Sequence, residues 1–181
     1  GNVINIHLTL IPYLRAAGEL KTKPTQHSVG KLREIGLQAD ILLCRTEKPL
    51  SRKVREKIAL FCNVDVDAVI QARDVRDIYE IPLVFHEQGL DDLIIKFLEL
   101  KPERGHDLME WQERVVRPAL SPHHGPVRIA VVGKYTELQD AYKSIYEAIR
   151  HGAIANDCAV EIKRLEAEKL EKKEVRLFLQ Q

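Results

Sequence analysis

The sequence predicts an α/β fold with a mainly parallel sheet, followed by the first strand–helix–strand unit of another α/β domain. Short apolar runs alternate with stretches whose apolar residues recur at the helical period. Residues 118–126 hold three prolines in nine positions, which is typical of a linker, and a second strand–helix–strand pattern follows them. We therefore expect domains at 1–117 and 127–181, joined by a linker at 118–126.

The first predicted strand and helix occupy the N-terminal 36 residues. The apolar run from Val3 to Leu10 predicts a buried strand, and we interpret His7 within it as a hydrogen-bonded core histidine rather than a catalytic base. Thr25 is suited to cap the next helix, and Gly36 to end it.

Two more buried strands are predicted at 40–44 and 68–70, with a helix between them. Ser51 is expected to cap that helix. Its apolar positions follow the helical period and are Val54, Ile58, Phe61 and Cys62.

After Val75 the pattern changes to short helical pieces at 78–79, 83–88 and 91–98. The last of these has an apolar stripe suited to covering a sheet edge or docking a partner, formed by Leu93, Ile94, Phe97 and Leu98. Residues 107–117 predict another amphipathic helix.

The second domain begins with a predicted strand at 127–132, a helix at 140–149 and a strand at 159–163. The helix is expected to face inward through Ala141, Ile145, Ala148 and Ile149. A charged helical stretch at 166–181 follows.

The composition limits the classes of function. With 28 basic and 27 acidic residues the formal charge is +1, which argues against a protein that coats nucleic acid or another polyanion. The apolar start is too short to span a membrane and lacks signal-peptide features, so a cytoplasmic location is expected. Cys44, Cys62 and Cys158 have no paired spacing and predict buried thiols, and adjacent His123 and His124 do not predict a metal site.

The charges are unevenly distributed. Residues 15–57 contain 11 basic and 5 acidic side chains, a local charge of +6, whereas residues 65–99 contain 3 basic and 9 acidic ones, a local charge of −6. This asymmetry fits either an anion-binding face or two solvated helices of different charge.

Residues 21–26 (KTKPTQ) place two ammonium groups, two hydroxyls and an amide just before a predicted helix. Such a segment can bind phosphate, because lysines neutralise charge while hydroxyls and helix N–H groups donate hydrogen bonds. The alternative is a solvated basic loop. Gly133-Lys134-Tyr135 follows a strand but is not a P-loop, since Arg128 and Tyr135 break that pattern.

Several ungapped segments in order resemble the cytidine triphosphate (CTP) synthase family. They are residues 18–29 (GELKTKPTQHSV), 41–45 (ILLCR), 57–64 (KIALFCNV), 78–82 (IYEIP), 88–92 (QGLDD), 133–135 (GKY) and 140–144 (DAYKS). The resemblance covers residues 2–165. It implies an internal fragment: the C-terminal half of a P-loop-like synthetase domain, and the first βαβ unit of a class I glutamine amidotransferase domain.

The resemblance also implies an activity and its site residues. The family uses ATP and Mg²⁺ to aminate UTP with ammonia from glutamine, responds to GTP as an effector, and forms homotetramers. UTP and the inhibitor CTP would bind Lys21, Thr22, Lys23, Pro24, Thr25, Gln26 and Lys57. ATP would contact Arg73, Asp74 and Val75, and Lys134 and Tyr135 would lie near the interdomain ammonia path.

The resemblance leaves both catalytic centres incomplete. The family's glycine-rich loop and magnesium-binding carboxylates are expected upstream of Gly1, and its cysteine nucleophile beyond Gln181, so we expect no catalytic or metal-binding residue in this chain. The chain alone is expected to be inactive. The alternative function is a non-catalytic nucleotide-binding or protein-interaction module; a third, nonspecific nucleic-acid binding through residues 15–57, predicts steep salt dependence.

Overall fold

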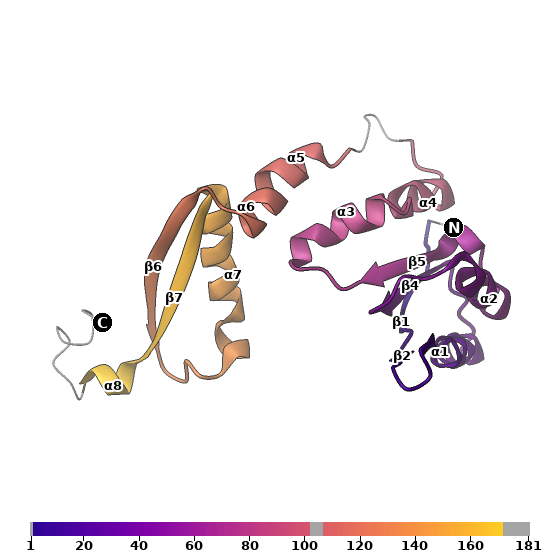
Figure 1. The fold of residues 1–181 in the computed structure, drawn as a ribbon, viewed down its shortest axis with the longest axis horizontal. Helices are drawn as coiled ribbons and strands as arrows, with labels where there is room; N and C mark the ends of the chain where they lie inside the picture. Colours follow the sequence, from indigo (N-terminus) through magenta and orange to yellow (C-terminus); the bar gives the residue numbers. More distant parts are fainter. Residues whose placement is uncertain (1, 102–106, 172–181) are drawn as a thin grey trace. The chain divides into compact units, whose positions relative to one another are not determined.

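A computed structural model describes residues 2–101 and 107–171 (Figure 1). The chain forms two compact units, Gly1–Leu108 and Met109–Gln181, and each is described by itself.

The first unit is built on a three-stranded parallel sheet in the order β1-β4-β5. The strands are β1 (Ile6–Leu10), β4 (Ile41–Thr46) and β5 (Val69–Arg73), and the crossover helices are α1 (Lys23–Glu34) and α2 (Arg52–Cys62). These helices cover one face of the sheet, where Val29, Leu42 and Ile58 are fully buried. The predicted parallel α/β architecture is confirmed.

Two shorter helices, α3 (Ile81–His86) and α4 (Leu90–Phe97), cover the opposite face. The predicted apolar stripe lies on α4. Its residues Leu93, Ile94 and Phe97 pack against buried residues of the sheet, among them Ile41 and Ile70. The stripe therefore covers this chain's own sheet, which removes the reason for assigning it to a partner.

The first strand is less buried than predicted. The side chains of Ile6, Leu8 and Leu10 are 41%, 64% and 57% exposed. The strand's other face points toward α1, where His7 Nε2 lies 2.8 Å from Ser28 Oγ and Thr9 donates a 3.1 Å hydrogen bond to Thr25. β1 is thus an edge strand with a polar inner face, and His7 is hydrogen-bonded as predicted.

The start of α1 also differs from the prediction. A small hairpin of β2 (Tyr13–Leu14) and β3 (Glu19–Leu20) precedes the helix, which begins at Lys23 with Thr22 as its N-cap residue. Pro24 fits the first turn because proline lacks the N–H that would be unpaired there. Thr25 lies inside the helix and is not its cap, whereas Gly36 ends it with φ of 84° as predicted.

For helix α2 the predicted N-cap is confirmed, but the predicted set of buried residues is partly wrong. Ser51 Oγ accepts a hydrogen bond from the Val54 N–H, which confirms the predicted cap. Ile58 and Cys62 are buried as expected, but Phe61 is 55% exposed and Ala59 is buried instead. The 3₁₀ turns η1 (Val66–Ala68) and η2 (Ile78–Glu80) complete this unit.

The second unit begins with a helical segment that includes a π turn. It comprises α5 (Met109–Trp111), η3 (Gln112–Val116) and α6 (Arg117–Leu120). Strand β6 (His124–Gly133) then starts only three residues after α6. The expected irregular linker at 118–126 is therefore mostly helix and strand.

The predicted βαβ unit is confirmed. Strands β6 and β7 (Cys158–Glu166) pair in parallel and are joined by α7 (Gln139–Ala155). The inward face of α7 was predicted wrongly, since Ala141 and Ala148 are exposed and Ile145 is 44% exposed. Ala153 and Ile154 are buried instead.

The C-terminal prediction is only partly testable. Glu166 ends β7, and the helix α8 covers Ala167–Glu171. The remainder of the predicted helical stretch, 172–181, lies outside the described residues.

The cysteines match the prediction of buried thiols. Cys44 and Cys62 are buried and Cys158 is half-buried, all three unpaired. Burial raises the pKa of Cys44 to about 12 and raises that of Cys62, so these two thiols are poor nucleophiles at neutral pH.

Candidate nucleotide-binding site

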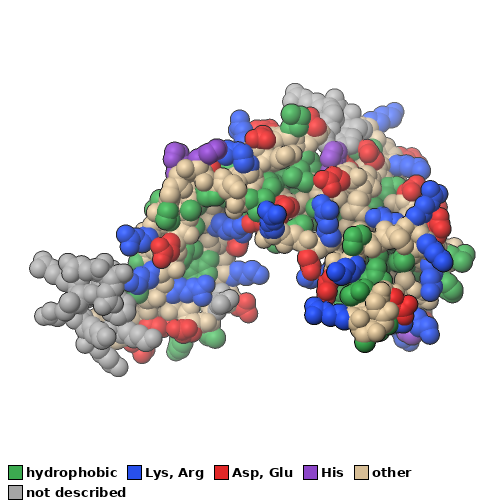
Figure 2. All heavy atoms as spheres, in the orientation of Figure 1, with side chains coloured by type: hydrophobic (Ala, Val, Ile, Leu, Met, Phe, Trp, Pro, Cys, Tyr) green, Lys and Arg blue, Asp and Glu red, His purple; other side chains and the backbone are tan. Residues whose placement is uncertain are grey.

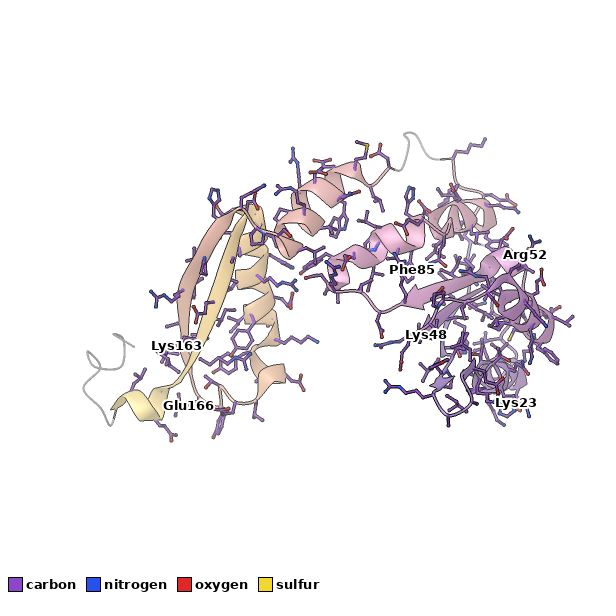
Figure 3. The ribbon with its side chains drawn as sticks, viewed as in Figure 1. Lys23, Lys48, Arg52, Phe85, Lys163 and Glu166 are labelled. Atoms are coloured by element: carbon purple, nitrogen blue, oxygen red, sulfur yellow. The ribbon has the colours of Figure 1, made fainter. Side chains whose placement is uncertain are left out.

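The predicted phosphate-binding segment 21–26 lies at the junction of the small hairpin and α1. Lys21 follows β3, its N–H donating a 2.9 Å hydrogen bond to the Pro12 carbonyl, and Lys23 is the first residue of α1. The Lys21 side chain is partly exposed and that of Lys23 is exposed. Figure 3 marks Lys23 at this end of the helix. Both ammonium groups are accessible to an anion beside a helix N-terminus, where backbone N–H groups favour negative charge.

The two threonines of this segment have protein partners. Thr25 is fully buried, and its hydroxyl lies 3.2 Å from the Leu10 carbonyl and accepts from Thr9. Thr22 is 6% exposed and its Oγ1 accepts a 3.1 Å hydrogen bond from Gln26 Nε2. In this conformation the Thr25 hydroxyl holds the segment to β1, the Thr22 hydroxyl is bonded within the segment, and the lysines provide its exposed charge.

Lys57 lies on α2, and its charge affects the same carboxylate, Glu19, with which Lys21 pairs. The pKa of Glu19 is lowered, first by its hydrogen bond from Lys21 and by that ammonium's charge, and further by the charge of Lys57. Glu19 and Lys21 form an ion pair at the surface, with side chains 55% and 42% exposed. Lys21 therefore contacts Glu19 directly, whereas Lys57 acts on it only through its charge.

The three predicted ATP contacts lie at the carboxyl end of β5. Arg73 ends the strand and pairs with Glu87 at 3.5 Å, while Asp74 pairs with Arg45 at 3.4 Å. Val75 is half-buried. This edge of the sheet gathers the carboxyl ends of the strands, where open α/β sheets bind their ligands.

A cavity of about 610 Å³ opens at this edge. Residues 8–13, 45–47 and Asp74 line it, so one of the three predicted ATP contacts faces the cavity. Lys48, which follows β4, has its ammonium 5.4 Å from the centre of the Tyr13 ring (Figure 3).

Sequence reasoning did not single out Glu19 or Lys48. Glu19 stands two positions before Lys21. An acidic residue so close to a basic segment was the one sequence signal that could have predicted their ion pair. The surface of this unit is rich in Lys and Arg side chains, with Asp and Glu between them (Figure 2).

Lys134 and Tyr135 lie in the second unit, in the turn between β6 and α7. Both side chains are exposed, Tyr135 to 71%, and Tyr135 adopts a left-handed backbone conformation with φ of 58°. The Tyr142 hydroxyl donates a 2.8 Å hydrogen bond to the Lys134 carbonyl.

The described residues contain no group of three or more His, Cys, Asp or Glu side chains that could hold a metal ion. In the same part of the chain, no helix combines the length and apolar character needed to cross a membrane.

Comparison with known proteins identifies the family. The family model described as "CTP synthase N-terminus" matches residues 1–100. The chain is 53% identical over 171 residues to CTP synthase from Geotalea uraniireducens, covering 94% of this chain and 32% of that protein. It is 55% identical over 176 residues to CTP synthase from Methanocaldococcus jannaschii, covering 96% and 32%. The chain thus spans about a third of the length of these curated relatives, and it belongs to the CTP synthase family.

Proposed function

We propose that this chain is the pyrimidine-nucleotide-binding part of a CTP synthase. In the reaction, ATP phosphorylates O4 of UTP, and ammonia displaces that phosphate to give CTP, ADP and inorganic phosphate. Hydrolysis of glutamine to glutamate supplies the ammonia. The observation that supports the proposal is the placement of two accessible lysines, Lys21 and Lys23, beside the start of α1.

Lys21, Lys23 and Lys57 would bind the triphosphate of UTP or CTP. A triphosphate carries several negative charges, and Lys21 would exchange its pair with Glu19 for a stronger charge-assisted contact. Because these groups contact phosphates and not the base, substrate and product inhibitor would share them. Thr22, Pro24, Thr25 and Gln26 would shape the segment.

The other predicted contacts complete the proposal. ATP would bind at the carboxyl edge of the sheet near Arg73, Asp74 and Val75. Residues 1–117 would form the C-terminal part of the synthetase domain, and 127–181 the beginning of the glutaminase domain. Lys134 and Tyr135 would lie near the ammonia path. Mg²⁺ dependence, GTP activation, a homotetramer and a cytoplasmic location belong to the same proposal.

The test is UTP dependence in a complete CTP synthase that contains this chain in place of the matching segment. Charge-assisted hydrogen bonds contribute roughly 1.5–3 kcal/mol each, so Lys21→Ala or Lys57→Ala should raise the UTP requirement by about 10-fold or more. Lys31→Ala is the matched control, because Lys31 lies in the last turn of the same helix α1. Unchanged UTP affinity in both site variants would show that the assignment is wrong.

The alternative functions have less support. The interaction module rests on the incomplete sites, the apolar stripe Leu93 to Leu98 and the charged C-terminal helix. Three residues of that stripe, Leu93, Ile94 and Phe97, pack on the chain's own sheet. Nonspecific nucleic-acid binding through 15–57 predicts binding that weakens steeply with salt and ignores base identity. Titration with UTP, CTP and single-stranded DNA at two salt concentrations separates it from nucleotide binding.

A further inference from the structure

The turn that contains Lys134 and Tyr135 is held by a carboxylate from the end of the neighbouring strand. Glu166 is the last residue of β7 and lies opposite Gly133, the last residue of β6, in the parallel register. Its two carboxylate oxygens accept hydrogen bonds from the Tyr135 N–H at 3.1 Å, the Thr136 N–H at 2.5 Å and the Thr136 hydroxyl at 2.8 Å.

These contacts have the geometry of an anion bound by consecutive backbone N–H groups. The left-handed conformation of Tyr135 turns its N–H and that of Thr136 toward one point. Thr136 is only 2% exposed, so its hydroxyl and N–H are directed inward and not to solvent. The hydrogen bond from the Thr136 hydroxyl is the largest of the causes that lower the pKa of Glu166, which keeps the carboxylate ionised at neutral pH.

A second contact holds the other side of the turn. Tyr142 on α7 donates to the Lys134 carbonyl, and a Cβ added to Gly133 would overlap the same hydroxyl. The peptide group that joins Lys134 to Tyr135 is thus held at its carbonyl by Tyr142 and at its N–H by Glu166, and the next peptide group is held by Glu166 at the Thr136 N–H. The Lys134 side chain itself is exposed. Figure 3 marks Glu166 at the end of β7.

We infer that Glu166 is a positioning residue: by binding the N–H groups of Tyr135 and Thr136, it fixes the direction in which Lys134 and Tyr135 project. This inference rests on the proposed role of Lys134 and Tyr135 in ammonia transfer. Glu166 itself does not contact a reacting group. Removing it would leave the strand in place and release the turn.

The geometric part is tested on the 181-residue chain by NMR. The amide protons of Tyr135 and Thr136 should lie downfield, and both should titrate together with a midpoint below the ordinary glutamate pKa. In Glu166→Gln this titration should disappear, and exchange of both amides with solvent should accelerate. Glu161→Gln, an exposed change of the same kind on β7, should leave both amides unaffected. Unaltered titration and exchange in Glu166→Gln would overturn the inference.

The functional part is tested in the complete enzyme by comparing two nitrogen sources. Glu166→Gln should lower glutamine-dependent CTP formation by about 10-fold or more, since small misplacements of positioned groups reduce rates to that extent. CTP formation from added ammonia should change by less than about twofold, because it does not need transfer between domains. Thr136→Val should reproduce the loss, and Thr136→Ser, which keeps the hydroxyl, should restore activity.

Activity of Lys134→Ala distinguishes failure of the positioning role of Glu166 from failure of the ammonia-path proposal on which that role rests. If Lys134→Ala lowers the ratio of glutamine-dependent to ammonia-dependent activity and Glu166→Gln does not, the positioning role is wrong and the ammonia-path proposal stands. If neither variant changes the ratio, the ammonia-path proposal is wrong and the inference falls with it.

Discussion

Asp157 joins the beginning of β6 to the turn that precedes β7. Its carboxylate accepts hydrogen bonds from the His123 backbone N–H at 3.1 Å and from the Arg117 guanidinium at 3.3 Å, and lies 2.5 Å from His123 Nδ1. The hydrogen bond from the His123 ring is the main cause that lowers the pKa of Asp157 from 3.8 to about 2; the His123 N–H and the charge of Arg117 add to it.

A carboxyl group whose pKa is lower in the folded state stabilises the fold above its unfolded pKa and loses that effect as the pH falls. We expect the difference in unfolding free energy between the wild type and Asp157→Asn to be full at neutral pH and to vanish between about pH 4 and pH 2. Asparagine tolerates the left-handed backbone found at this position, so the substitution tests the charge.

Urea unfolding followed by the fluorescence of Trp111, the single tryptophan, reports this unit. Glu161→Gln is the control. A stability difference that persists at pH 2 would contradict the assignment of the effect to Asp157 ionisation.

The sequence predicted the lysines of the candidate site and missed two carboxylates: Glu19, which pairs with Lys21, and Glu166, which binds backbone N–H groups in the second unit. Lys21, Lys23 and Lys57 were predictable from the basic segment and the family motif. Glu19 was signalled only by its place two positions before Lys21. Glu166 was not predictable, because it lies 31 positions from Tyr135 and meets it only through the parallel pairing of β6 and β7.

At the scale of elements, α4 provides a direct test of the two uses proposed for its apolar stripe. Ile94 is half-buried against the sheet. Ile94→Ala should lower the unfolding free energy by about 1–2 kcal/mol, because complete burial of such a side chain contributes roughly 1.5–3 kcal/mol. Leu60→Ala, at a position 78% exposed on α2, should change it by less than about 0.5 kcal/mol. Chemical denaturation of the chain measures both.

The opposite result would restore the docking hypothesis. If Ile94→Ala left stability unchanged while abolishing capture of a partner protein, the stripe would be an interaction surface.

Elements with a clear period were predictable, and the details that depend on neighbours were not. β4, α2 and the βαβ unit follow from the apolar pattern. Phe61 and Ile145 were predicted to be buried but are exposed. Their helices carry apolar residues on more than one side, so the sequence alone does not determine which side is buried. The proline-rich segment suggested a linker, but Pro118 lies in the first turn of α6, where proline is tolerated, and Pro126 lies beside an irregularity in β6.

At the scale of the whole molecule, the chain covers 32% of its relatives' length. We expect the purified 181-residue chain to make no CTP from UTP, ATP, Mg²⁺ and ammonia, and to release no glutamate from glutamine. Nucleotide quantification by chromatography and a glutamate assay test both activities. Turnover by this chain without any added protein would refute the expectation.

The close approach of Gly133 to Tyr142 makes these two positions epistatic. A Cβ at position 133 would lie 2.0 Å from the Tyr142 hydroxyl, so a side chain there requires the end of the tyrosine to move away from the Lys134 carbonyl. A saturation library should therefore favour glycine at position 133 while Tyr142 is present. Replacing Tyr142 by alanine removes the steric conflict and also the hydrogen bond. A double substitution should therefore cost little more than Tyr142→Ala alone, because glycine at position 133 is then no longer needed to accommodate the tyrosine.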